Sequence, residues 1–340
     1  MVALSQVPAP ALRTGPGVQA AQDAKEPEVL ATCKVPPPAR GRGATGPGPA
    51  NAVQETFPRD YTVTAIPGVV AAGQKWKEVW TVEGNNADGI IGTRDGGLLI
   101  AQNDNSAVVK LDTVKLDKNG KPSVVYPDTN TGGALSMNSK GVLFLNSRGL
   151  KASVMELAPQ RRTFANSYQG DSLDCIGGAL NDLMADSKGG VYFTMGGLFY
   201  ADPKGVVTRY GKNLDTNGIV LSADEKTLYV TNGMTLAALD VQKDGSLTNQ
   251  REFARLGGGG GGDGSTIDAA GRIYVSSSPG VHVIGPDGKY LGLIPTPRGL
   301  ISVAFSGPDK KTLYAVARTG NTDWIIGIPM IAQGYKRRAK

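Results

Sequence analysis

Residues 180–194 read LNDLMADSKGGVYFT, in which a polar entrance leads into a short apolar run, a polar turn and a second apolar run. The same order recurs along the chain, and its second apolar runs begin 45, 48, 37, 45 and 40 residues apart. These runs are 98–100, 143–145, 191–193, 228–230, 273–275 and 313–315. Because a lone four-stranded sheet exposes two faces that only neighbouring sheets can cover, this spacing is typical of propeller blades. The sequence therefore predicts an all-β fold, a six-bladed β-propeller.

The chain divides into three predicted segments. Residues 1–58 hold ten of the 21 prolines and lack apolar periodicity, which predicts an extended or disordered arm. Residues 59–330 form the propeller, and residues 331–340 form a basic C-terminal tail. An early strand over 77–82 is expected to complete the last blade, which ends near 324–326, and so to close the ring.

The composition excludes several classes of protein. The 340 residues include 36 Lys and Arg against 30 Asp and Glu, and much of the resulting charge of +6 lies in the tail and the arm. The body is therefore close to neutral, and no nucleic-acid partner is expected. No apolar run approaches the ~18–20 residues of a membrane helix, so no membrane span is expected.

The histidine and cysteine counts narrow the chemistry further. The single histidine, His282, cannot supply both a Ser-His-Asp system and a His-rich metal site, and it alternates with valines as an ordinary strand residue. Cys33 and Cys175 form either one disulfide that ties the arm to the body or two free thiols. Two compartments are therefore compatible with the sequence. The protein is periplasmic or secreted if a signal peptide has been removed, and otherwise cytoplasmic.

A second pattern stands ten or eleven positions before each apolar run, at the entrance of each repeat's first strand. The residues there are Asp88, Gly133, Asn181, Asn217, Asp263 and Ser302. Because the innermost strand of every propeller blade starts at the same end of the central channel, equivalent positions converge on the axis. Two carboxylates and two amides are therefore expected in one small volume.

Carboxylates that are brought together repel each other unless a cation neutralises them. Oxygen donors without sulfur or imidazole suit Ca²⁺, with Mg²⁺, Mn²⁺ or Zn²⁺ as alternatives. The sequence thus predicts one divalent cation, held by Asp88, Asn181, Asn217 and Asp263. Glu83 is an alternative first-blade ligand, and the simpler alternative for the whole set is that Asn and Asp cap turns.

Three stretches resemble the SMP-30/gluconolactonase family of six-bladed propellers, which is related to paraoxonase-like lactonases. They are 180–186 with 192–194, 217–222 with 228–231, and 263–268 with 271–289. The resemblance implies a calcium-dependent lactonase in which Asn217 and Asp263 bind the metal and Asn181 contacts metal or substrate. The acidic first-blade ligand falls on Asp88, or on Glu83 if the Glu83-Gly84 pair is the match.

Two departures from the family pattern bear on the substrate and the base. Ala179 stands where sugar-lactonase members carry a substrate-binding Arg, which puts gluconolactone itself in doubt. The histidine pair of the paraoxonases is missing, so any base must be a carboxylate.

We therefore predict a metal-dependent hydrolase that opens a lactone or related ester of a small molecule. The cation polarises the carbonyl and Asp263 activates water. The candidate substrate contacts are Glu83, Asn85, Asn86 and Asn103. Two alternatives are a non-catalytic scaffold propeller with a structural calcium, whose N-terminal arm engages a protein partner, and a lyase or isomerase acting on a sugar-derived compound.

Overall fold

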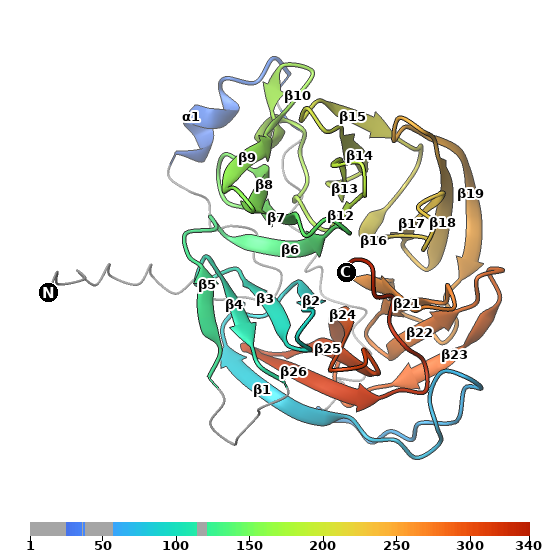
Figure 1. The fold of residues 1–340 in the computed structure, drawn as a ribbon. Coiled ribbons are helices and arrows are strands. Elements are labelled where there is room, and N and C mark those ends of the chain that lie inside the picture. The colour runs from blue at the N-terminus through green and yellow to red at the C-terminus, as the bar shows by residue number, and fades with distance from the viewer. Residues whose placement is uncertain (1–24, 36, 38–56, 114–120) are drawn as a thin grey trace, which may run out of the picture.

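Strands form wherever the short apolar runs recur. The computed structural model describes residues 25–35, 37, 57–113 and 121–340. In these residues, six four-stranded sheets surround one central axis, accompanied by a two-stranded hairpin (Figure 1). The predicted all-β, six-bladed propeller is confirmed.

Blades 1 to 5 run in chain order from the axis to the rim, with antiparallel neighbours. Blade 1 consists of β2 (Ile90–Gly92), β3 (Leu98–Gln102), β4 (Ala107–Leu111) and β5 (Ser123–Tyr126). Blade 2 consists of β6 (Gly132–Met137), β7 (Leu143–Ser147), β8 (Ser153–Ala158) and β9 (Arg162–Ala165). Blade 3 consists of β12 (Leu183–Ala185), β13 (Val191–Thr194), β14 (Leu198–Ala201) and β15 (Val207–Tyr210).

The second half of the ring repeats this arrangement. Blade 4 consists of β16 (Thr216–Leu221), β17 (Thr227–Asn232), β18 (Thr235–Val241) and β19 (Leu247–Arg255). Blade 5 consists of β20 (Ser265–Ile267), β21 (Ile273–Ser276), β22 (Gly280–Ile284) and β23 (Tyr290–Pro295). Blade 6 consists of β24 (Leu300–Ser306), β25 (Thr312–Thr319), β26 (Thr322–Pro329) and, at the rim, β1 (Lys77–Glu83).

The ring closes through β1, which comes from the start of the propeller and pairs with β26 from its end. The register runs from Lys77 opposite Gly327 to Glu83 opposite Thr322. This pairing confirms the predicted closure. Because β1 supplies the outer strand of the last sheet, the two ends of the propeller are held together by backbone hydrogen bonds.

In blades 2, 3 and 5, one carboxylate or amide side chain sets the turn between the first two strands. In blade 3, Asp186 Oδ1 accepts hydrogen bonds from the backbone N–H groups of Lys188, Gly189 and Gly190 at 2.8–2.9 Å. Asn138 and Asp268 fill the same role in blades 2 and 5. Such side-chain turns fix the register of the two strands they join.

The core lies between the blades. Strands β13 and β21 are buried at every position, whereas the rim strands β5 and β19 are largely exposed. Neighbouring blades cover both faces of the inner strands, which is why their sequences are continuous apolar runs. Tyr192 and Tyr274 are among the largest fully buried side chains. Burial of a large apolar side chain contributes roughly 1.5–3 kcal/mol, so packing between blades stabilises the ring.

The described part of the N-terminal arm is attached to the rim. It contains the short helix α1 (Glu26–Leu30), and Cys33 forms a disulfide with Cys175 at the end of the 3-10 helix η1 (Leu173–Cys175). Lys34 Nζ donates to the carbonyl of Gln169, between β10 (Ser167–Tyr168) and β11 (Asp171–Ser172). Neither described helix is long and apolar enough to cross a membrane. The rest of the predicted arm, 1–24, 36 and 38–56, lies outside the described residues.

Residues 330–340, which we call the axial segment, turn back across the ring, and the chain ends near its centre (Figure 1). Ala339 forms an isolated β-bridge with Met137 at the end of β6. Thr266 Oγ1 of blade 5 donates to the carbonyl of Lys340 at 2.6 Å. The stretch predicted as a basic tail therefore contacts the inner strands of the propeller.

Candidate functional site

The first residues of the innermost strands lie around the axis at one end of the ring. Glycine follows Asp88, Asn217 and Asp263, and it allows neighbouring strands to approach closely. A Cβ atom at Gly218 would lie 1.9 Å from the Asp263 carbonyl oxygen. The tight spacing of these backbones brings the side chains of the preceding residues toward one another.

Three of the four expected metal ligands belong to one hydrogen-bond network. Asn181 Nδ2 donates to Asn217 Oδ1 at 2.9 Å. The Asn181 side-chain oxygen accepts from Arg148 Nη2 at 3.1 Å, and the same guanidinium forms an ion pair with Asp88. Asp88, Asn181 and Asn217, which come from three blades, are therefore linked through Arg148.

Asp263 lies within electrostatic range of this network. Burial, followed by repulsion from Asp88 and Asp182, raises the pKa of Asp263 to about 8, against the opposing effect of the Arg148 guanidinium. No side chain in the described part of the protein donates a hydrogen bond to the Asp263 carboxylate. Since a nearby cation favours an ionised carboxylate, Asp263 is the acidic group of this site that would gain most from one.

Arg148 is the main site residue that the sequence analysis missed. It follows β7 in blade 2, and it donates from Nε to the carbonyl of Leu180 at 2.8 Å and from Nη2 to that of Asn181 at 2.7 Å. A Cβ atom at Gly133 would lie 2.1 Å from the Arg148 guanidinium carbon. Gly133, the ring position without a side chain, thus makes room for the guanidinium.

Two of the expected substrate contacts adjoin Asp88. Asn103 Nδ2 lies 2.8 Å from Asp88 Oδ2 and 3.2 Å from Asn85 Oδ1. Asn85 Oδ1 also accepts a hydrogen bond from Arg318, whose guanidinium pairs with the fully buried Asp323. Asn85 and Asn103 are therefore held beside the site by a rigid polar cluster.

Asn86 and Glu83 have other surroundings. The buried Asn86 donates from Nδ2 to the Glu83 carbonyl, and its side-chain oxygen accepts from the Asn105 N–H, so its amide stabilises the loop. Glu83 is the exposed last residue of the rim strand β1. Among the described residues, no hydrogen bond or ion pair joins its carboxylate to Asp88, Asn181, Asn217 or Asp263. Of the two first-blade carboxylates, Asp88 is the one in the axial network.

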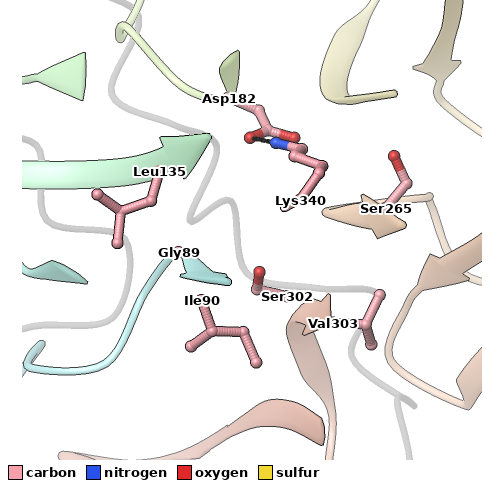
Figure 2. Close-up of a pocket in the computed structure, with 8 residues that line it drawn as sticks. All are labelled: Gly89, Ile90, Leu135, Asp182, Ser265, Ser302, Val303 and Lys340. Atoms are coloured by element: carbon pink, nitrogen blue, oxygen red, sulfur yellow. Dashed lines mark hydrogen bonds and ion pairs between the residues drawn. The ribbon is translucent and has the colours of Figure 1, made fainter. Parts of the chain in front are cut away.

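A second polar layer lies beneath this network. Asp182 Oδ2 accepts a hydrogen bond from the Ile219 N–H at 2.9 Å, and its carboxylate forms an ion pair with Lys340. A small cavity beside this pair has a volume of about 10 Å³, which is enough for about one water molecule. Figure 2 shows its lining residues, Gly89, Ile90, Leu135, Asp182, Ser265, Ser302, Val303 and Lys340.

The donor types fit a hard divalent cation. The described residues contain no group of three or more His, Cys, Asp or Glu side chains placed to hold a metal, so a cation here would depend on amide as well as carboxylate oxygens. Carboxylate and amide oxygens are the ligands that Ca²⁺ takes. Arg148 already pairs with Asp88 and Asn181, so all four donors can serve one ion only if the guanidinium moves aside.

Comparison with known proteins places these features in context. A family model described as "SMP-30/Gluconolactonase/LRE-like region" matches residues 70–319. The chain is 26% identical over 217 residues to a gluconolactonase of Zymomonas mobilis, which covers 54% of this chain and 60% of that protein. It is 31% identical over 162 residues to pentonolactonase XacC of Haloferax volcanii, covering 43% and 56% of the two chains. The chain thus spans less than two thirds of these curated relatives.

Solved structures share the fold. A gluconolactonase from Xanthomonas campestris superposes with a TM-score of 0.66 at 21% identity, covering 80% of this chain and 96% of that one. A calcium-binding protein, regucalcin, from Agrobacterium tumefaciens superposes with a TM-score of 0.59 at 18% identity, covering 75% and 95%. At such identities these structures support the propeller architecture alone.

Proposed function

The chain belongs to the SMP-30/gluconolactonase/LRE-like family, and we propose that it hydrolyses a lactone or related ester at the axis of its propeller. The observation that carries the proposal is the meeting of Asp88, Asn181 and Asn217 from three blades in one network, with Asp263 in electrostatic contact. The activities that name the gluconolactonase and pentonolactonase relatives support a lactone as the substrate class.

A divalent cation, for which we propose Ca²⁺, would be held by Asp88, Asn181, Asn217 and Asp263. When bound, it would polarise the substrate carbonyl and offset the negative charge that develops on its oxygen. The carboxylates of Asp88 and Asp263 supply the negative charge of the site, while the two asparagines supply neutral oxygens and hold the spacing between blades.

Asp263 is the proposed base. In its ionised form it accepts a proton from a water molecule as the water oxygen bonds to the lactone carbonyl carbon. The ring C–O bond then breaks, and the proton passes to the departing ring oxygen, which gives a hydroxy acid. Because burial raises the pKa of Asp263 to about 8, its carboxyl group needs a nearby cation to be ionised at neutral pH.

Arg148, Asn85 and Asn103 are the proposed substrate contacts. Four of the five N–H groups of Arg148 are directed to Asp88, Leu180 and Asn181. If the guanidinium moves aside for the cation, the N–H groups that it withdraws from Asp88 and Asn181 become available to a substrate oxygen. The Asn103 amide donates to the same Asp88 oxygen as Arg148 and to the side-chain oxygen of Asn85. A polar, hydroxylated lactone matches such a set of donors and acceptors.

The test combines metal removal with a panel of lactones. We expect that treatment with EDTA abolishes hydrolysis and that added Ca²⁺ restores it, with Mg²⁺, Mn²⁺ and Zn²⁺ as comparisons. D263N should lower kcat by about 10²–10⁴-fold, as expected for loss of a general base, while D60N, at an exposed carboxylate, should match the wild type. Equal turnover of EDTA-treated and calcium-loaded protein would rule the mechanism out.

A second candidate function is a binding propeller in which the axis is structural. The Arg148–Asp88 ion pair favours it, because the chain's own cation already neutralises one of the two ring carboxylates. This candidate predicts that the protein binds small polar ligands without converting them, and that none of the lactones tested gives a hydroxy acid. The same panel, followed by mass spectrometry of the ligand, separates the two functions.

We also propose that the protein works in an oxidising compartment. The Cys33–Cys175 disulfide supports this proposal, since such bonds persist in secreted and periplasmic proteins and are rare in the cytosol. Fractionation of cells that produce the full chain, with thiol labelling of each fraction, tests it. Protein found in the cytosol with two free thiols would contradict it.

A further inference from the structure

The axial segment contacts the innermost strands at one end of the ring. The innermost strands begin at the candidate site and end at the opposite face, and it is at these far ends that the segment binds. Ala339 exchanges two backbone hydrogen bonds with Met137, the last residue of β6, at 2.9 and 3.0 Å. Arg338 Nη2 donates to the carbonyl of Ser222, just after β16, at 2.7 Å. The segment therefore enters the channel from the face opposite to the candidate site.

From there, the side chain of Lys340 reaches into the channel (Figure 2). Its ammonium pairs with the Asp182 carboxylate and donates to the carbonyl of Leu183 at 2.7 Å. The side chains of Lys340 and Asp182 are only 8% and 10% exposed. An ion pair so well shielded from water is strongly constrained in geometry, because each group would otherwise be left buried without a partner.

Asp182 connects this ammonium to the candidate site. It directly follows Asn181 in the chain, and its Oδ2 accepts the backbone N–H of Ile219, two residues after Asn217. Thr194 adds a further link. Its hydroxyl donates a hydrogen bond to the Asn217 carbonyl and accepts one from the Asp182 N–H. The carboxylate of Asp182 thus ties the entrances of blades 3 and 4 together directly beneath the two amides.

We propose that Lys340 is a positioning residue for the candidate site, acting through Asp182 on the spacing of Asn181 and Asn217. The inference rests on the proposed function. Without the ammonium, the Asp182 carboxylate would be a buried, uncompensated charge, and it would turn toward the nearest remaining cation. Such a turn releases the Ile219 N–H and lets the two asparagine ligands move apart.

The experiment compares K340M, K340R and K336M in the full chain. Lys336 is an exposed lysine of the same axial segment, so K336M controls for loss of a positive charge. Calcium affinity is measured by calorimetry, and kcat and KM are measured with a lactone that the wild type hydrolyses. We expect K340M to weaken calcium binding about 10–100-fold, the range seen when residues that support metal ligands are removed. K340R should keep most of the affinity, and K336M all of it.

Several results decide the matter. Wild-type calcium affinity and KM in K340M overturn the inference, as does a lower unfolding temperature without a change in affinity, since Lys340 would then only stabilise the fold. If K340M does not fold, K340Q, which removes the charge but keeps a hydrogen-bond donor to Asp182, is measured instead, and unchanged calcium affinity in that variant also overturns the inference. A wild-type protein that neither binds calcium nor hydrolyses any lactone overturns the proposed function together with this inference, whereas K340M that matches an active wild type overturns this inference alone.

Discussion

The guanidinium of Arg148 is paired with the carboxylate of Asp88 at the axis, although the two residues come from different blades. Their side chains are 20% and 18% exposed, so the pair is shielded from water but still open to the site. The same guanidinium donates a hydrogen bond to the side-chain oxygen of Asn181. Arg148 therefore competes with any cation for two of the four proposed ligands.

Removal of this competitor should strengthen calcium binding. In R148M, Asp88 loses its ion pair and the Asn181 side-chain oxygen loses a donor, so both become available to the metal. We expect Kd for Ca²⁺, measured by calorimetry, to fall about tenfold, while KM for a lactone rises because one substrate contact is lost. R209M, on the exposed rim strand β15, is the matched control. Unchanged or weaker calcium binding in R148M would show that the guanidinium does not compete.

A methyl group at position 133 should displace Arg148 without removing its charge. The added Cβ of G133A would lie 2.1 Å from the guanidinium carbon, so the guanidinium must leave its place. We expect the free energy of unfolding, measured by urea denaturation, to fall by about 1–3 kcal/mol, as for other overpacked sites, and lactone turnover to fall with it.

The control for this substitution is G299A. The nearest atom to a Cβ there is 3.6 Å away, an ordinary contact distance, so G299A should behave as the wild type. If G133A matched G299A in stability and turnover, the close packing of Gly133 against Arg148 would not matter for the site.

The sequence was sufficient to predict the ring and part of its axis, because both depend on local pattern. Turn residues such as Asp186 fix strand pairing within a few residues, and the offset that singled out Asp88, Asn181 and Asn217 follows from the start of each innermost strand. A repeat carries that information at a fixed spacing, and the propeller converts it into convergence in space.

Other site residues lie outside the repeat and could not be found in this way. Arg148 reaches the axis from the end of a second strand, and Lys340 reaches it from the axial segment. Conversely, a residue close in sequence to the site need not belong to it. Glu83 is five residues from Asp88, yet Gly84, with a φ of 78°, turns the chain between the rim and the axis. The missing side chain at Gly133 was the one signal in the sequence that pointed toward Arg148.

His282 makes stability depend on pH below neutrality. It is fully buried in β22, and burial lowers its pKa to about 4 from the usual 6.5. The folded state therefore binds a proton on His282 less readily than the unfolded chain does. The contribution of the neutral imidazole to stability is fully present above pH 6.5 and is lost as the pH falls toward 4. Asp263, whose pKa is raised to about 8, acts in the opposite direction over the same pH range, so the contribution of His282 is taken as the difference between wild type and H282N. We expect this difference in the free energy of unfolding, measured by urea denaturation at each pH, to be about 2–3 kcal/mol.

Because His282 is the only histidine, the assignment is direct. As pH falls from 6.5 to 4, the wild type should lose stability relative to the neutral variant H282N. An imidazole NMR signal that titrates near pH 6.5 in the folded protein would contradict the prediction.

Reduction of the Cys33–Cys175 disulfide should destabilise the protein by loosening the attachment of the arm. The bond joins residues 142 positions apart, and loss of a crosslink that closes a long loop typically costs about 2–4 kcal/mol. We expect dithiothreitol to lower the unfolding temperature of the wild type, measured by circular dichroism, and the C33S/C175S variant to unfold at that lower temperature whether or not dithiothreitol is present. Should the wild type be insensitive to reduction and show two reactive thiols when unfolded without reductant, the cysteines are not bonded and the attachment of the arm depends on contacts such as Lys34 with Gln169.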